Sequence, residues 1–132
     1  MRITADTNIL LRAVLPDDHG QQQAAIGALK SAELVAVSVH ALCEFVWVMR
    51  RSYKAADDQI AEAIRRLIEM HNVIINRPAV EAGLRMLEAG GDFADGVIAF
   101  DGQWLGSDTF LSFDQKAVKL LTERGEAAEL LA

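Results

Sequence analysis

The sequence is poor in cysteine, in long apolar runs and in positive charge. A single cysteine, Cys43, excludes an internal disulfide framework and a zinc site built from several cysteines. A free thiol is typical of the reducing cytoplasm, where we expect the protein to act. The longest uninterrupted apolar stretch runs from Phe45 to Met49, far short of the roughly 20 residues that a membrane-spanning helix needs.

The shortage of basic residues also limits the expected partners. The chain has 13 Lys and Arg against 19 Asp and Glu, for a net charge of −6, which argues mildly against a large nucleic-acid surface. Arg2, Asp6 and Arg12 interrupt the N-terminal apolar residues, so we expect no signal peptide. With 132 residues, 52% of them apolar, the composition is that of one globular domain covering residues 1–132.

The hydrophobic pattern predicts short strands alternating with helices. Strands are expected at residues 2–5, 34–37, 73–75, 109–113 and 129–132, and helices at 9–14, 21–31, 41–52, 57–70, 78–88, 93–105 and 114–124. Such alternation indicates an α/β fold whose mostly parallel sheet is covered by helices on both faces.

Two acidic residues directly follow predicted strands. Asp6 follows the first strand, and Asp114 follows the strand at residues 109–113. Ligands of open parallel sheets bind outside the carboxyl ends of the strands, so both side chains are candidates for a binding site there. Each residue could instead cap the helix that begins after it, which is the commoner role of an aspartate at such a position.

Two further acids lie in apolar surroundings. Glu44 is the only charged residue between positions 41 and 49, and Asp95 is the only one between positions 93 and 100. A helix that is apolar all round is expected to be largely buried, where a carboxylate needs a cationic partner. A pair with Arg12 or Arg50 is the structural alternative for Glu44, and a favourable position in a helix's first turn is the alternative for Asp95.

Oxygen ligands of this kind suit Mg²⁺ or Mn²⁺ better than zinc. Such ions activate water and neutralise charge that develops on a phosphoryl group, so the four acids indicate hydrolysis of phosphate esters. The sequence contains no P-loop, no dinucleotide-binding glycine motif and no serine-hydrolase motif, and its three histidines are scattered.

The ordered motifs resemble the PIN-domain family, and most closely the VapC-type ribonuclease toxins of toxin–antitoxin modules. Four segments carry the resemblance: Ala5-Asp6-Thr7-Asn8, Cys43-Glu44, Asp92-Phe93-Ala94-Asp95, and Thr109 to Asp114. The resemblance implies a three-layer α/β fold and a metal-dependent endoribonuclease that uses Mg²⁺ or Mn²⁺. It also implies a homodimer that a cognate antitoxin inhibits.

Matched position by position, the resemblance assigns catalysis and metal binding to Asp6, Glu44, Asp95 and Asp114, with Asn8 and Ser112 in support. Two divalent ions would neutralise four of the negative charges, so RNA remains a possible substrate despite the acidic balance. Arg50, Arg51 and Lys54 are candidates to contact its phosphates, or else belong to an ordinary solvated face.

The sequence departs from the family pattern at two positions. Gly96 follows Asp95 where alanine is usual, which is expected to weaken the helix by up to ~1 kcal/mol. Asp92 is an additional acid that we interpret as a helix N-cap.

Other functions and a partner surface follow from the same residues. An aspartyl-nucleophile phosphatase is one alternative, although that class needs a second aspartate at position 8, where this chain has asparagine. A catalytically silent PIN-fold binding module is another.

The apolar surface of the helices at residues 21–31, 41–52 and 57–70 exceeds what a sheet covers, so we expect a groove for an amphipathic antitoxin segment, unless Trp47, Ile60 and Ile64 are all buried.

Overall fold

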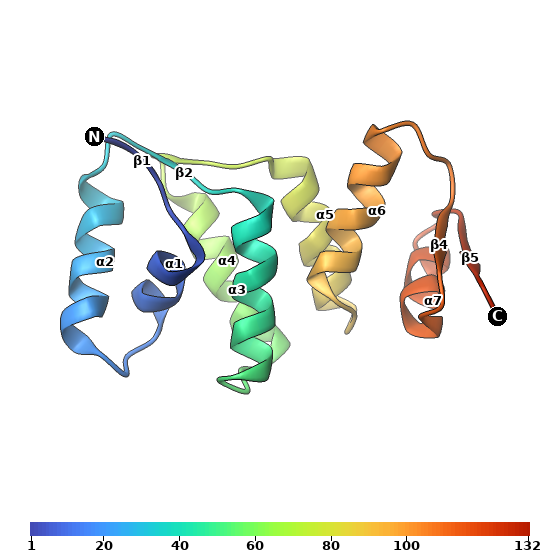
Figure 1. Cartoon of the computed structure of the whole chain (residues 1–132), viewed down its shortest axis with the longest axis horizontal. Coiled ribbons are helices and arrows are strands. Elements are labelled where there is room, and N and C mark those ends of the chain that lie inside the picture. The colour runs from blue at the N-terminus through green and yellow to red at the C-terminus, as the bar shows by residue number, and fades with distance from the viewer. The chain divides into compact units, whose positions relative to one another are not determined.

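Seven helices and five strands alternate along the chain in the computed structural model, which describes residues 1–132 (Figure 1). The chain divides into two units, Met1–Asn76 and Arg77–Ala132, here named unit 1 and unit 2. Every strand pairs in parallel with its neighbours. The predicted α/β class is therefore confirmed, with helices and parallel strands consistent with a three-layer PIN-like fold.

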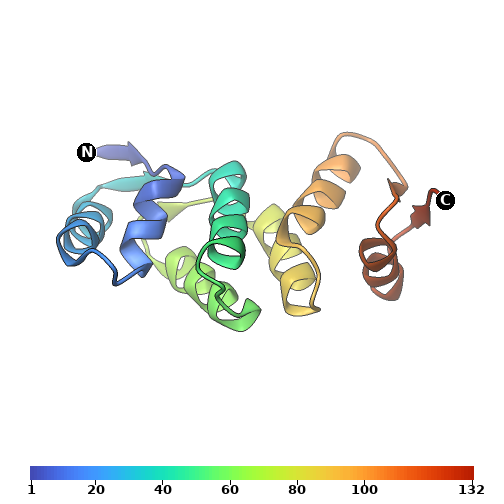
Figure 2. The same ribbon diagram turned by 60° about the horizontal axis from the view of Figure 1, so that its bottom comes forward.

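Unit 1 contains a parallel sheet of three strands with the order β1-β2-β3 (Figure 2). Ile3 of β1 lies opposite Val35 of β2, which lies opposite Val73 of β3. The elements are β1 (Arg2–Thr4), α1 (Thr7–Val14), α2 (His19–Ser31), β2 (Leu34–Ala36), α3 (Val39–Arg51), α4 (Asp57–Glu69) and β3 (Val73–Ile74). The predicted elements of this unit all occur, with ends that differ by one or two residues.

Polar side chains determine where the helices of unit 1 begin. Asp6, Asp18 and Ser38 each accept a hydrogen bond from a backbone N–H in the first turn of α1, α2 and α3. Asp57 and Asp58, which the sequence suggests as caps of α4, lie instead inside its first turn. The side chain of Gln59 instead accepts the backbone N–H of Ala56, at 3.1 Å.

The prediction that α3 is buried on nearly all sides is also wrong. Its buried side chains form one stripe, which comprises Ala41, Leu42, Phe45, Val46 and Met49. The opposite face exposes His40, Glu44, Trp47 and Arg51, and Trp47 is 58% exposed. Apolar composition did not reveal this face, because Trp47 has its indole ring beside the Arg51 guanidinium, 5.3 Å from the ring centroid, rather than in the core.

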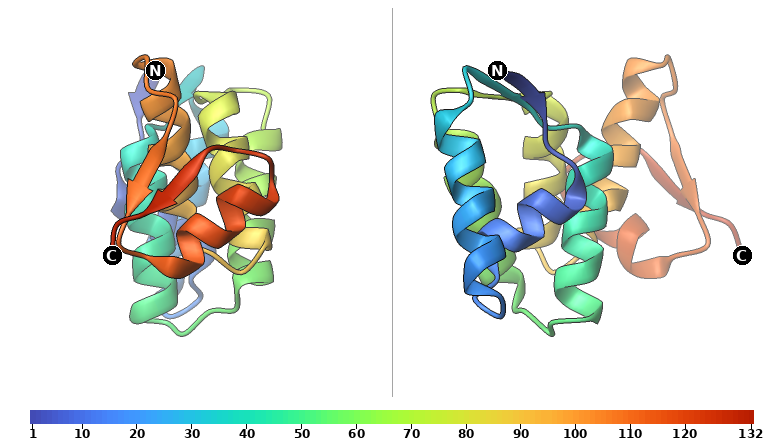
Figure 3. Two further views of the ribbon diagram at one scale, coloured as in Figure 1. Left: turned by 90° about the vertical axis from the view of Figure 1, so that its right-hand side faces the viewer. Right: turned by 60° about the vertical axis from the view of Figure 1, so that its left-hand side comes forward.

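Unit 2 pairs two helices and adds a parallel strand–helix–strand motif. Its elements are α5 (Arg77–Glu88), α6 (Phe93–Trp104), β4 (Phe110–Ser112), α7 (Gln115–Glu123) and β5 (Ala128–Leu130). Figure 3 shows α7 connecting the parallel strands β4 and β5. Met86, Ala99, Ala117 and Leu121 form one buried apolar cluster of this unit. Gly90, with a φ of +93°, follows the end of α5 and has the left-handed backbone conformation in which glycine commonly ends a helix.

Helices α5 and α6 approach each other so closely that one position admits only glycine. A Cβ atom on Gly96 would overlap the carbonyl oxygen of Ala82 and would lie 2.9 Å from the Cα of Gly83 and the Cβ of Met86. The expectation that Gly96 merely weakens α6 is therefore incomplete, because its missing side chain makes room for the neighbouring backbone.

No helix of the chain combines the length and the hydropathy that crossing a bilayer requires.

Candidate functional site

Asp6 lies between the end of β1 and the start of α1. The backbone N–H of Ala5 extends the pairing with β2 by donating to the carbonyl of Ala36 at 3.0 Å, and Asp6 follows as the exposed N-cap of α1. Its Oδ1 accepts the backbone N–H of Ile9 at 3.0 Å. The capping interpretation of Asp6 is confirmed. The capping hydrogen bond occupies only one of the two carboxylate oxygens. Asn8 is exposed in the first turn of the same helix.

Glu44 lies on the exposed face of α3, a helix that packs against α1. The alternative in which Glu44 pairs with an arginine is wrong, since Arg12 donates to Asp17 at 3.0 Å and Arg50 donates to Asp57 at 2.9 Å. Glu44 has no ion pair in unit 1. Its carboxylate is therefore accessible to a cation and not committed to the fold.

Asp95 is the most perturbed acid of the chain. It is the third residue of α6 and is half-buried. Burial raises its pKa above the ordinary 3.8, and the negative charges of Asp92 and Asp114 raise it further. Asp92 caps α6 by accepting the Ala94 N–H at 3.1 Å, as predicted. Asp95 thus lies near the charges of two other carboxylates of unit 2, and none of the three forms an ion pair.

Asp114 follows β4 and begins α7. Its Oδ1 accepts the backbone N–H groups of Lys116 at 3.0 Å and Ala117 at 3.1 Å, so its capping role is confirmed as well. The Oγ of Ser112 accepts the backbone N–H of Asp114 at 2.9 Å. Ser112 therefore orients the residue that carries the acid, while its hydroxyl hydrogen stays available to a ligand.

The four predicted acids divide evenly between the units. Asp6 and Glu44 belong to unit 1, and Asp95 and Asp114 belong to unit 2. Neither unit by itself gathers three potential metal ligands. Within unit 2 the charged groups near Asp95 are the carboxylates of Asp92 and Asp114, and carboxylate oxygen is the donor type that Mg²⁺ and Mn²⁺ prefer.

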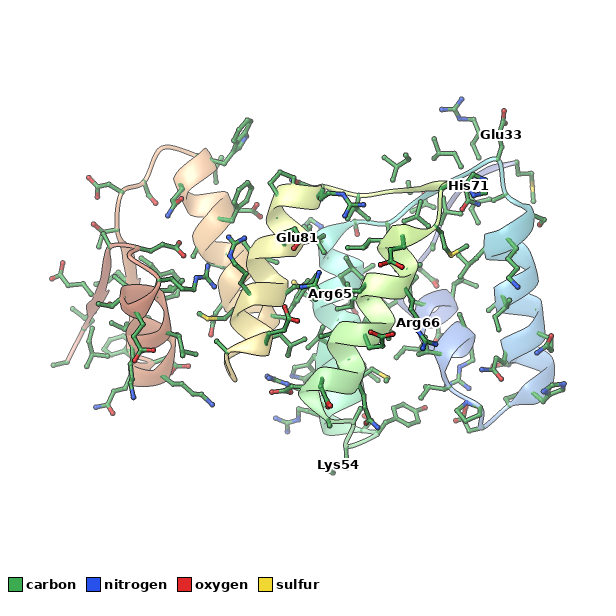
Figure 4. The ribbon with its side chains drawn as sticks, turned by 180° about the vertical axis from the view of Figure 1, so that it is seen from behind. Glu33, Lys54, Arg65, Arg66, His71 and Glu81 are labelled. Atoms are coloured by element: carbon green, nitrogen blue, oxygen red, sulfur yellow. The ribbon has the colours of Figure 1, made fainter.

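The three basic residues considered as phosphate contacts have different environments. Arg50 is held by Asp57, and Arg51 lies over the Trp47 ring. Lys54 is exposed in the turn between α3 and α4 (Figure 4). The Arg51–Trp47 contact was missed in the sequence, although their spacing of four residues along a helix is a signal for it.

Two of the parallel strands, β1 and β4, are each followed by an aspartate that caps the next helix, which places acidic side chains at the carboxyl ends of strands, where α/β proteins bind their ligands. The sequence model of the PIN domain family matches residues 3–120, and the chain therefore belongs to that family. PIN domains are typically metal-dependent nucleases that bind RNA, and this membership makes nuclease activity the general expectation. A search of curated proteins found no match to the chain.

Proposed function

We propose that this PIN domain is a metal-dependent endoribonuclease and the toxin of a toxin–antitoxin pair, acting in the cytoplasm. The observation that carries the proposal is the membership in the PIN family together with Asp95, a half-buried carboxyl group whose pKa is raised by its burial and by the charges of Asp92 and Asp114. A half-buried charge near other charges of the same sign is costly, so such a cluster favours a bound divalent cation.

Asp6, Glu44, Asp95 and Asp114 would together hold Mg²⁺ or Mn²⁺, and residues 1–132 would act as one domain. When bound, the ion supplies an activated water and offsets the charge that develops on the phosphoryl group. The caps support this role, because Asp6 and Asp114 are each held through Oδ1 alone and keep Oδ2 for a ligand. Asn8 and Ser112 would support Asp6 and Asp114, respectively.

The test is cleavage of a structured RNA by the purified chain. We expect cleavage that requires Mg²⁺ or Mn²⁺ and that falls at least a hundredfold in Asp6→Asn, Glu44→Gln, Asp95→Asn and Asp114→Asn. Glu33→Gln is the matched control, since it removes one exposed negative charge and leaves the four acids intact (Figure 4). Full activity in the four variants would refute the site.

The same preparations distinguish the two alternatives. A covalent phosphoryl group on Asp6 would support the aspartyl phosphatase and overturn the nuclease. Binding of RNA without cleavage at any divalent metal would identify a silent binding module.

We place the antitoxin on an apolar cleft of unit 1 between the helices. A small cavity of about 30 Å³ and a neighbouring cleft of about 150 Å³ share the side chains of Val14, Leu29 and Leu67. Ile60 and Ile64 are buried but Trp47 is exposed, so the condition that would have excluded a groove is not met. Lys30 and Arg66 line the cleft, which favours an amphipathic segment with acidic residues beside its apolar face.

If a small reading frame lies directly upstream of this gene, co-expression with its product tests this surface. Val14 is 37% exposed, so Val14→Asp should leave the fold and RNA cleavage intact while weakening the complex at least tenfold. Undiminished binding by this variant would place the antitoxin elsewhere.

The proposal includes a homodimer. The large apolar side chains that unit 2 exposes include Trp104, Leu105, Leu111 and Phe113. A second copy of the chain would remove such surface from water. Light scattering of the purified protein should give twice the 14.4 kDa mass of one chain, and a monomer at all concentrations would contradict this part.

A further inference from the structure

Unit 2 contains a second cavity, of about 220 Å³, that the four acids do not line. It lies between the C-terminal half of α6, the following loop, β4 and the residues before β5. This volume is below the roughly 300–1,000 Å³ of sites for drug-sized ligands, so it suits one small ring system.

The cavity shares a helix face with Asp95. Asp95, Ile98 and Gly102 stand at positions i, i+3 and i+7 of α6, and the last two line the cavity. Gln103, at its far end, is eight residues from Asp95, which is about 12 Å along a helix. A ligand in the cavity would therefore lie within about 12 Å, along the helix axis, of a phosphate held near Asp95.

The walls combine apolar side chains with hydrogen-bond acceptors. Ile98 and Phe110 supply apolar surface, while Asp108 and Glu126 supply carboxylates. Glu126 is firmly oriented, because its Oε1 accepts from Gln103 at 3.2 Å and its Oε2 accepts from Arg124 at 2.6 Å. A carboxylate oxygen accepts more than one hydrogen bond, so Oε1 keeps capacity for a ligand.

An acceptor-rich cavity selects a donor-rich ligand. Unstacked RNA bases are recognised by stacking on apolar or aromatic side chains and by hydrogen bonds to their edges. Guanine presents a ring N–H beside an amino group, adenine and cytosine present an amino group beside an acceptor, and uracil presents one N–H between two carbonyls. The carboxylates also repel phosphate, so the base and not the backbone would enter.

We propose that this cavity binds one base of the RNA substrate beside the cleaved bond, and that it prefers guanine. This inference rests on the proposed ribonuclease function for its biological role, but the cavity's affinity for a base does not depend on cleavage or on metal.

Binding of the four nucleosides to the full-length Asp95→Asn protein without metal tests the cavity directly. Titrations followed by NMR should show guanosine binding at least about tenfold more tightly than uridine, the discrimination of one good paired hydrogen-bond contact. Ser107 is exposed at the cavity, so Ser107→Phe should fill it and abolish binding without entering the core. Equal affinities for guanosine and uridine, or binding unaffected by Ser107→Phe, would overturn the proposal.

Variants that neutralise the carboxylates of the cavity distinguish base recognition from an effect on folding stability. Glu126→Gln and Asp108→Asn should each reduce the guanosine-to-uridine ratio to less than about threefold, whereas Glu123→Gln, an exposed acid of α7 outside the cavity, should leave it unchanged. Because Glu126 also pairs with Arg124, unfolding by urea is measured in parallel, and the ratio must change even where the variant is fully folded.

Cleavage of an RNA library gives the independent second result. A base preference next to the cut that disappears in Ser107→Phe supports the cavity as a substrate site. If the protein binds guanosine but cleaves no RNA, the cavity is a base-binding site and the proposed ribonuclease function is refuted. If the protein cleaves RNA without base preference and binds no nucleoside, the ribonuclease function stands and the base-binding site is refuted.

Discussion

Replacing Gly96 by alanine tests two opposing effects on stability. Alanine has the higher intrinsic helix propensity, but its methyl group must fit between α6 and α5. Alanine in place of glycine normally stabilises a helix by up to about 1 kcal/mol. In α6, however, the new methyl group would overlap the carbonyl oxygen of Ala82 and press on Gly83 and Met86 at 2.9 Å. Two of these contacts are with the α5 backbone, which no side-chain rotation can move.

Overpacking of a tight interior typically costs 1–3 kcal/mol, and a rigid backbone partner places this site near the upper end. After subtraction of the helix gain, we expect Gly96→Ala to reduce the free energy of unfolding by about 2 kcal/mol. Because Asp95 precedes this residue, displacement of α6 should also reduce RNA cleavage by the same protein.

Urea unfolding measures the change, with a lower midpoint and an unchanged slope expected for Gly96→Ala. Gly27→Ala in α2 is the matched control, because nothing lies within 4 Å of the added methyl group. That control should gain up to about 1 kcal/mol. If Gly96→Ala is stabilised to the same degree as Gly27→Ala, the close approach of α5 and α6 is refuted.

Three further predictions concern the acids. Ionisation of Asp95 is disfavoured in the fold, so the metal-free protein should gain stability as the pH falls through its raised pKa toward 3.8. Asp95→Asn should be at least as stable as the wild type at pH 7 and lack that part of the pH dependence in urea titrations; a less stable variant would contradict the repulsion. Mg²⁺ should raise the Tm of the wild type and have a smaller effect on Asp95→Asn, and equal shifts by calorimetry would count against metal binding there. Asp114→Asn should keep the cap and lose only cleavage, whereas Asp114→Ala should also lose about 1 kcal/mol of stability, because asparagine caps a helix as well as aspartate does. A destabilised Asp114→Asn in urea would show that the charge itself supports the fold.

The sequence was sufficient for the order of the elements and for the position of the strand-end acids. Alternation of short apolar runs with amphipathic stretches is a local property, and so is a cap such as Asp6, whose partner Ile9 lies three residues away. The helix stop at Gly90 is local in the same sense. Such features depend on neighbours in the chain, which the sequence displays directly.

Features that depend on residues distant in the chain could not be predicted from the sequence. Glu44 stands in the most apolar segment of the chain, and only the orientation of α3 reveals that its carboxylate is exposed. The rise in the pKa of Asp95 combines burial with the charge of Asp114, nineteen residues later. Neither effect has a periodicity that a pattern search would detect.

The sequence alone thus determined the α/β class, the helix caps and the acids that follow β1 and β4, because each depends on residues within one or two turns. Only the tertiary structure decided that position 96 must be glycine and that a cavity lies beside α6. Both depend on residues that lie against α6 from more than ten positions away in the chain, namely Ala82 beside Gly96 and Phe110 in the wall of the cavity. Packing distances of this kind arise when the elements assemble, and no single segment encodes them.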